Sequence, residues 1–467
     1  MKKKPLILLR ISHKRYVRRI KSKRKRFAKR RKTHYLYLDE KKELGGEFNY
    51  TNTLIKWLPT NITFILGCKK FLPDLGSLQW LVPRNDGIFL VPKNFSIRDE
   101  PKVTYLFIKQ ITAALLLQSY KEVKIDYNEC ENVDLGTQVF LDIILKDVIS
   151  FYKKCARFKS TNPYVTKIDG INIKNEKVKK LLFSVGSPAI HASKFIRYPD
   201  IVPYSLCIHN SQGDSTNSKS MDQKDVDTTT LVDYVLSCLK RVNKSLTQES
   251  IDNLCIVISE ILINAEEHST TKHRFSIGYF TEINEKDKHY GVFRLVILNL
   301  GQTIYEKFKD PDCPNKGIVS KMKSLSETYT KKKYFFSKSF EEETLWTLYS
   351  LQEGVTSIAP EQYKKRGNGS IQFIESFFNL RGAKTEDHQS NMVLLSGNTK
   401  ITFDGTFRTI EKESDGETFT YITFNDSENI EDKPNEKFVK FVDDYFPGTL
   451  ISARIIFNED DVKDQTE

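Results

Sequence analysis

The sequence predicts an α+β protein made of several units, and three observations support this. Its 467 residues suggest about three domains. With 39% hydrophobic and 12% aromatic residues, the composition argues against a disordered chain. From about residue 50 to 160, and again from 228 to 460, short apolar runs typical of strands alternate with segments whose apolar residues recur at helical spacing.

Residues 1–45 are expected to form a basic arm. The first 32 residues contain 17 Lys and Arg, which leaves 56 basic against 60 acidic side chains in the rest of the chain. The runs at 21–26 and 29–32 are dense enough to predict salt-sensitive nucleic-acid binding through residues 1–33. An acidic membrane surface, or no partner at all, remains an alternative.

Several protein classes are excluded. The chain has no run of 18 apolar residues, so no membrane span is expected, and the apolar stretch at its start ends too early, at Arg10, for a signal peptide. The seven cysteines are scattered and form no C-x-x-C pair, which is typical of reduced thiols and predicts a cytoplasmic protein. Motifs of P-loop proteins, zinc proteases and α/β-hydrolases do not occur.

Residues 50–160 predict a small α/β domain. Strands are expected at 87–92 and 123–127, and helices at 103–120 and 138–153. Residues 161–227 are expected to be a connector, since 160–210 looks irregular and 210–220 lacks large apolar residues.

The segment after Thr247, a predicted N-cap with Ser250 as the alternative, carries the most informative pattern. One face of this predicted helix is apolar, and another presents Glu260, Asn264 and His268 at intervals of four residues. A carboxylate can deprotonate a water or a hydroxyl, and an amide oxygen is a suitable ligand for Mg²⁺. The alternative is an ordinary solvated helix face.

Three further segments follow in order. A buried-looking strand at 292–298 leads into Asn299-Leu-Gly301-Gln-Thr303. Gly367-Asn368-Gly369 opens an apolar helix, where backbone N–H groups can approach an anion. The last predicted strand, 448–457, begins with Gly448-Thr449.

Taken together, these four segments resemble the ATP-binding module of the GHKL ATPases. The stretch around Glu260, Asn264 and His268 is similar to their N box, above all to that of the anti-sigma-factor serine kinases. The resemblance covers about residues 228–457. It implies an α/β sandwich with helices on one face of a mixed sheet, spanning 228–460, that takes ATP and Mg²⁺ as cofactors.

The resemblance also implies residue roles. Glu260 would be the general base, and Asn264 would bind Mg²⁺. His268 would lie near the phosphates or would cap the helix, and the interval 305–366 would be the ATP lid, with Trp346 and Leu348 on its helix. The remaining nucleotide-binding residues implied are Asn299 and Thr449 at the adenine, and Gly301, Thr303, Arg366, Gly367, Asn368 and Gly369 around the pocket and phosphates. For Arg366 a plain charge run is the alternative.

Two positions depart from the family pattern. Its adenine-reading Asp is Asn299 here, and the usual second glycine of that box is Thr303. ATP binding is still expected, whereas turnover is open. Three functions therefore stay in view: a nucleotide-driven ATPase switch, a serine/threonine protein kinase of the anti-sigma-factor type, and an ATP sensor that does not hydrolyse.

The domain at 50–160 resembles, more faintly, the STAS domains that partner anti-sigma-factor kinases. The resemblance lies in a strand at 124–126, a turn at Val133-Asp134 and a following helix. The phosphoacceptor serine of such domains is replaced by Leu135, and Thr137 is expected to be a helix N-cap. A protein partner would bind through this domain or through the lid, and a dimer is left open.

Overall fold

A computed structural model describes residues 58–72, 78–83, 86–117, 119–158, 166–190, 196–210, 219–267, 269–271, 273–285, 288–330, 340–357, 369–381, 390–414 and 417–458. The basic arm lies outside these residues. The chain forms two compact units, one of residues 1–58 and 150–163, the other of 59–149 and 164–467. Among the described helices, none is long and apolar enough to cross a membrane.

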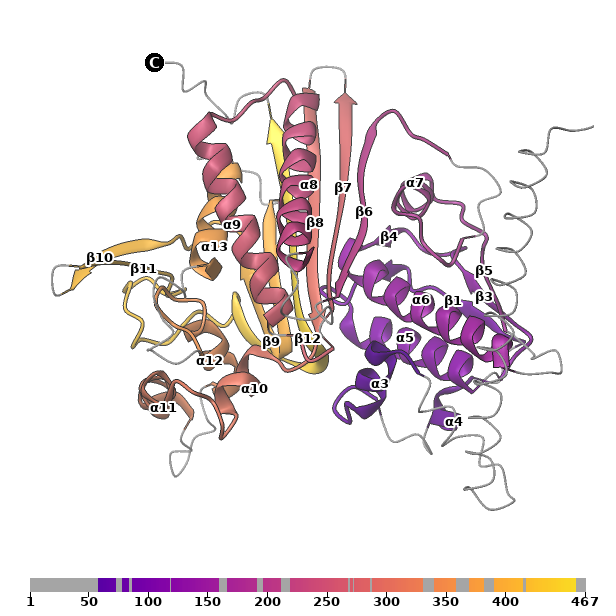
Figure 1. The fold of residues 1–467 in the computed structure, drawn as a ribbon, viewed down its shortest axis with the longest axis horizontal. Coiled ribbons are helices and arrows are strands. Elements are labelled where there is room, and N and C mark those ends of the chain that lie inside the picture. The colour runs from indigo at the N-terminus through magenta and orange to yellow at the C-terminus, as the bar shows by residue number, and fades with distance from the viewer. Residues whose placement is uncertain are drawn as a thin grey trace, which may run out of the picture. The chain divides into compact units, whose positions relative to one another are not determined.

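The mixed α+β composition is confirmed (Figure 1). The elements before residue 211 are α3 (Thr60–Gly67), α4 (Leu78–Leu81), β1 (Ile88–Leu90), β2 (Asn94–Phe95), α5 (Pro101–Leu116), β3 (Glu122–Asp126), β4 (Asn132–Val133), α6 (Leu135–Phe158), β5 (Lys167–Ile171), α7 (Glu176–Val185) and β6 (Ile201–Asn210). Those after it are α8 (Lys219–Arg241), α9 (Gln248–Glu267), β7 (His273–Glu285), β8 (Lys288–Leu300), α10 (Ile304–Lys309), α11 (Lys316–Thr330), α12 (Glu342–Tyr349), α13 (Gly369–Arg381), β9 (Asn391–Phe403), β10 (Ile410–Ser414), β11 (Glu417–Tyr421) and β12 (Val439–Asn458).

Strands β1, β3 and β5 form a parallel sheet in the order β1-β3-β5, with α5 and α6 as the crossovers. The face predicted for the strand at 123–127 is confirmed, because Val123, Ile125 and Tyr127 are all buried. Helix α6 begins after Asp134, whose carboxylate accepts hydrogen bonds from the N–H and the hydroxyl of Thr137. Asp134 therefore caps the helix, and the N-cap expected at Thr137 is wrong by three residues.

The larger sheet is antiparallel, in the order β6-β7-β8-β12-β9. Helices α8, α9 and α13 pack on one of its faces (Figure 1). In β12 the residues alternate between faces, so Ala453 and Ile455 join the core under these helices. Leu450 points to the opposite face, where it lies against Gly136 of α6. The parallel α/β part and the antiparallel part thus share a contact within one compact unit.

The expectation that residues 160–210 are irregular is wrong, because β5, α7 and β6 lie there. Helix α7 has an Asn175 N-cap and a left-handed Gly186 after its end, but its apolar residues are separated by lysines, which masked the pattern. Strand β6 carries Pro203, which an edge strand tolerates since one side needs no ladder hydrogen bonds. The predicted domain boundaries stay predictions.

Candidate functional site

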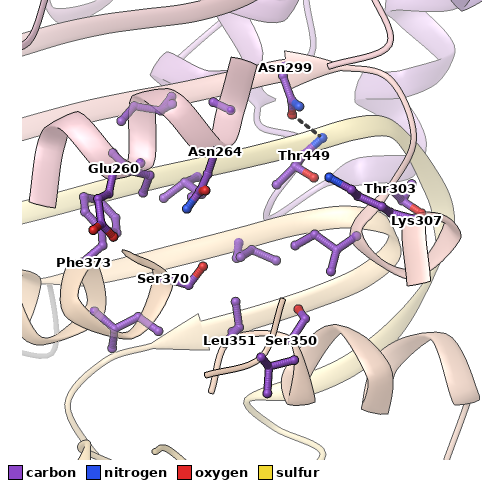
Figure 2. Close-up of a pocket in the computed structure, with 18 of the residues that line it drawn as sticks. Glu260, Asn264, Asn299, Thr303, Lys307, Ser350, Leu351, Ser370, Phe373 and Thr449 are labelled. Atoms are coloured by element: carbon purple, nitrogen blue, oxygen red, sulfur yellow. Dashed lines mark hydrogen bonds between the residues drawn. The ribbon is translucent and has the colours of Figure 1, made fainter. Parts of the chain in front are cut away.

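A cavity of about 250 Å³ lies between α9, α13 and the helix-covered face of the antiparallel sheet (Figure 2). This is close to the lower end of the roughly 300–1,000 Å³ of small-molecule pockets. Residues predicted from sequence that line it are Glu260, Asn264, Asn299, Thr303 and Thr449. Three of the four predicted segments, which lie far apart in the chain, therefore meet at one cavity.

Helix α9 supplies Glu260 and Asn264. The predicted N-cap is confirmed, since Thr247 Oγ1 accepts a hydrogen bond from Ser250 N–H at 3.2 Å. The apolar stripe predicted for this helix packs into the core, which fixes the rotation of the helix and leaves Glu260 and Asn264 half-buried on the cavity side. His268, the third member of the predicted row, lies outside the described residues.

The end of α9 is tied to the end of β8. Ser269 Oγ donates a hydrogen bond to the Leu300 carbonyl at 3.0 Å, and Gln302 N–H donates to Thr270 Oγ1 at 2.9 Å. Arg274, in strand β7, donates a hydrogen bond to the Leu262 carbonyl of α9 at 3.1 Å. It also forms an ion pair with Asp227 of α8 at 2.8 Å. These contacts hold the carboxylate-bearing helix and the Asn299 strand in one arrangement.

Asn299 and Thr449 face each other across the paired strands β8 and β12. The backbone N–H of Thr449 donates a hydrogen bond to Asn299 Oδ1 at 3.2 Å (Figure 2). The Thr449 hydroxyl lies 3.0 Å from Ser396 Oγ of β9, which also accepts from Ile304 N–H. Asn299 is only 2% exposed, so its amide belongs to the cavity wall and not to the solvent.

Thr303 has a structural role that the sequence did not predict. Its hydroxyl accepts from Glu306 N–H, and the Glu306 carboxylate accepts from Thr303 N–H, both at 3.1 Å, which forms a capping box at the start of α10. The pKa of Glu306 is lowered although burial alone would raise it, because hydrogen bonds from Thr303 N–H, Lys70 and Tyr445 favour the charged form. Thr303 therefore orients the helix that lines one side of the cavity.

The glycine predictions have mixed outcomes. Gly301 is buried, and its N–H donates to the Pro447 carbonyl at 3.3 Å, so it does not itself line the cavity. Gly369 is the first residue of α13, and the next residue, Ser370, lines the cavity. Arg366, Gly367 and Asn368 lie outside the described residues, as do Lys364 and Lys365.

Sequence reasoning missed several residues of the cavity wall. Lys307 of α10 lines it, and Figure 2 shows its side chain extending toward Thr449. The capping-box pattern from Thr303 to Glu306 was the available signal, because it predicts a helix that carries Lys307 in its second turn. The other polar wall residues that were not predicted are Gln302, Ser350, Thr356, Ser357 and Ser370.

The predicted lid contains α10, α11 and α12. Trp346 and Leu348 of α12 are buried, but so is every residue from 344 to 349, so this helix is not amphipathic as expected. The Trp346 indole N–H donates to Ser326 Oγ of α11 at 3.0 Å. Leu351, the second residue after α12, lines the cavity. Apolar residues of all three helices, among them Phe308, Met322 and Leu345, therefore belong to the core.

Among the described residues, no group of three or more His, Cys, Asp or Glu side chains could hold a metal ion. A Mg²⁺ ion that keeps waters and phosphate oxygens needs only one or two protein ligands, and the Asn264 amide fits that requirement.

Comparisons with protein-family models, with curated proteins and with solved structures found no match.

Proposed function

We propose that the cavity binds a purine nucleoside triphosphate with Mg²⁺, and that residues 228–460 act as a GHKL-type nucleotide switch. One observation carries this proposal: a single cavity is lined by residues from three separate segments of the predicted site, namely Glu260 and Asn264, Asn299 and Thr303, and Thr449. ATP is the nucleotide that the sequence resemblance implies.

The architecture supports the same proposal. Three helices on one face of a sheet agree with the sandwich expected for a GHKL module, although the sheet is antiparallel throughout and not mixed as expected. The parallel strands β1, β3 and β5 with their helical crossovers agree with a STAS-like domain in front of it. Leu135 is the second residue after β4 and is buried, so this domain would act through contact and not through a phosphoserine at that position.

Under this proposal, the residues that line the cavity form two groups, one for each end of the nucleotide. Asn299 and Thr449 would meet the base, and α9 would present Glu260 and Asn264 to the phosphates. Bound Mg²⁺ would neutralise phosphate charge. The Asn264 amide oxygen would be its protein ligand, and the Glu260 carboxylate would accept a proton from the attacking water or hydroxyl.

Phosphate release from Mg²⁺-ATP and Mg²⁺-GTP, with binding followed by calorimetry, tests this function. Glu260→Gln should keep binding and lose turnover, because the amide cannot accept the proton. Asn264→Ala should weaken Mg²⁺-dependent binding. Glu249→Gln is the matched control, since Glu249 is an exposed carboxylate in the first turn of the same helix.

The outcomes separate the three alternatives. Phosphate released to water makes the module an ATPase, phosphate found on a protein makes it a kinase, and tight binding without either makes it a sensor. If no purine triphosphate binds to the wild-type chain, the proposed function is wrong.

The basic arm adds a separate proposal, which rests on its sequence. Residues 1–33 would retain nucleic acid by contacts with phosphates, because counterion release makes such binding strong at low salt. Deleting them should abolish salt-sensitive retention on immobilised RNA or DNA and leave nucleotide binding intact. Unchanged retention would remove this role from the arm.

A further inference from the structure

A second cavity, of about 320 Å³, lies on the other face of strands β9 and β12 from the candidate functional site. Successive residues of a strand point to opposite faces, and accordingly Leu394 lines the candidate site whereas Leu395 lines the second cavity. Arg98 and Pro101, at the start of α5, and Tyr105 within this helix form another part of its wall. All of these residues belong to the same compact unit.

Two lysines face each other in this wall. Lys400 of β9 and Lys440 of β12 are direct partners in the antiparallel register, and both line the cavity. Like charges directly opposite each other on paired strands repel, so such a pair lowers stability when no anion lies between them. Lys400 Nζ donates to the Arg98 carbonyl at 2.6 Å, which supplies an acceptor but no negative charge. In the part of the chain that the structure describes, Lys440 forms no ion pair with an acidic side chain.

The acidic neighbours of Lys400 do not balance this positive charge. Burial, and after it the charge of Lys440, lowers the pKa of Lys400 to about 8. The charge of Arg98 adds to this effect, and Asp99 and Asp134 offset only part of it. A nearby negative charge would favour the charged form of a lysine. The pair of lysines is therefore suited to an anionic ligand.

Helix α5 adds to the positive potential in the cavity. The helix begins at Pro101 in the cavity wall, and its N-cap residue, Glu100, forms no side-chain hydrogen bond to the first turn. The N-terminus of a helix carries a partial positive charge and N–H groups without intrahelical partners, both of which favour an anion. The helix end and the two lysines therefore favour the same kind of ligand.

A buried hydroxyl group in the same wall also lacks a partner. Tyr105 is 3% exposed, and its hydroxyl forms no hydrogen bond with a described residue, whereas buried hydroxyl groups in proteins normally have one. Burial raises the pKa of Tyr105, and the negative charge of Asp444 raises it further, so this carboxylate lies near the hydroxyl. Asp444 also lines the cavity. A hydroxyl group of a ligand can donate to Asp444 and accept from Tyr105.

We propose that the second cavity binds a small molecule that carries a phosphate group and hydroxyl groups. The phosphate lies between Lys400 and Lys440, and the hydroxyl groups meet Tyr105 and Asp444. The cavity volume falls in the range of roughly 300–1,000 Å³ of small-molecule pockets. This inference does not depend on the proposed function, because the two cavities lie on opposite faces of the same strands.

Calorimetric titration of the full chain with glycerol 3-phosphate tests the site, with inorganic phosphate and glycerol in parallel. Glycerol 3-phosphate should bind roughly tenfold or more tighter than inorganic phosphate, because only its hydroxyl groups meet Tyr105 and Asp444. Lys440→Gln should weaken its binding roughly tenfold or more, since a charge-assisted contact is lost. Lys174→Gln, at an exposed lysine outside the cavity, is the matched control and should keep the wild-type affinity.

Thermal unfolding supplies a readout that a merely structural lysine would not give. Without ligand, Lys440→Gln should unfold at a higher temperature than the wild-type chain, because the repulsion with Lys400 is removed. Excess glycerol 3-phosphate should raise the unfolding temperature of the wild-type chain more than that of this variant. Tyr105→Phe keeps the ring that packs on Phe71, and it should weaken the binding of glycerol 3-phosphate but not of inorganic phosphate.

Two results would overturn the inference. One is the absence of glycerol 3-phosphate binding to the wild-type chain. The other is equal affinity of the wild-type chain and Lys440→Gln, which would place the phosphate elsewhere, for example on the basic arm. Neither result bears on nucleotide binding, so the proposed function stands or falls separately.

Discussion

The Cα atom of Gly448 lies so close to the carbonyl group of Asn299 that a Cβ atom on this glycine would be 2.1 Å from the carbonyl oxygen. The φ angle of Gly448 is 144°, which side chains rarely adopt. This close approach places the N–H of the next residue, Thr449, on the Asn299 amide. The Gly-Thr pair at the start of the last predicted strand is therefore explained by backbone contact.

Gly448→Ala should consequently damage both fold and site. Either β12 or β8 must move to relieve the contact, and we expect the free energy of unfolding to fall by about 1–3 kcal/mol, with weaker nucleotide binding. Urea denaturation and calorimetry measure the two effects. Gly67→Ala is the control, since a Cβ there meets nothing within 4 Å. Equal stability of both variants would contradict the argument.

The capping box at Thr303 predicts an effect on the free energy of unfolding that depends on the hydroxyl group of this residue. Thr303→Ala removes the acceptor for Glu306 N–H and should lower the unfolding free energy by about 1 kcal/mol. Thr303→Ser retains the hydroxyl and should recover most of that loss. If serine and alanine were equally destabilising, the hydroxyl would not be the stabilising group.

The pair between Asp227 and Arg274 is buried, with side chains 8% and 3% exposed, and it connects α8 to β7. Arg274→Met should lower the unfolding free energy by about 3–5 kcal/mol, because it leaves the Asp227 carboxylate buried without this partner. Asp227→Leu combined with Arg274→Met should cost less than either single change. The exposed pair between Lys167 and Glu122 is the control, and Lys167→Met should have little effect.

A double-mutant cycle from urea denaturation gives the coupling energy of the buried pair. Strict additivity of the two single changes would contradict a stabilising interaction between these side chains.

Sequence periodicity predicted the elements that have one dominant apolar face. The helix from Gln248 to Glu267 was found with its N-cap, because Leu254, Ile258 and Leu262 recur at helical spacing and a threonine precedes them. The strand at 292–298 was predicted because its run of apolar residues is typical of a strand that is buried on both faces. The expectation that the motifs attached to these elements share one pocket came from the family resemblance and not from periodicity.

Elements whose stability depends on distant partners escaped prediction. Strand β6 contains a proline and forms only by pairing with β7, so its own residues do not signal a strand. Lys307 faces the cavity because of the position of α10 in the fold. In the sequence, nothing distinguishes it from a surface lysine. The orientation of the Asn299 amide likewise depends on Thr449, 150 residues away.

Asp142 of α6 predicts a pH dependence. It is 3% exposed, and its Oδ1 accepts hydrogen bonds from Ser187 Oγ at 2.7 Å and from Gln138 Nε2 at 2.8 Å. Burial disfavours the charged form and raises the pKa of Asp142 to about 7, despite these hydrogen bonds. In the unfolded chain the pKa of an aspartate is about 3.9, so the folded protein binds this proton more tightly.

Stability from the Asp142 proton is fully present below pH 4 and is lost as the pH rises through about 7. The unfolding free energy of the wild-type chain should therefore fall between about pH 4 and 7 relative to that of Asp142→Asn, whose amide oxygen still accepts both hydrogen bonds. Urea denaturation at several pH values measures this difference. Asp86→Asn, at an exposed position, should follow the wild-type curve, and parallel curves for wild type and Asp142→Asn would show that the carboxyl group is not the titrating element.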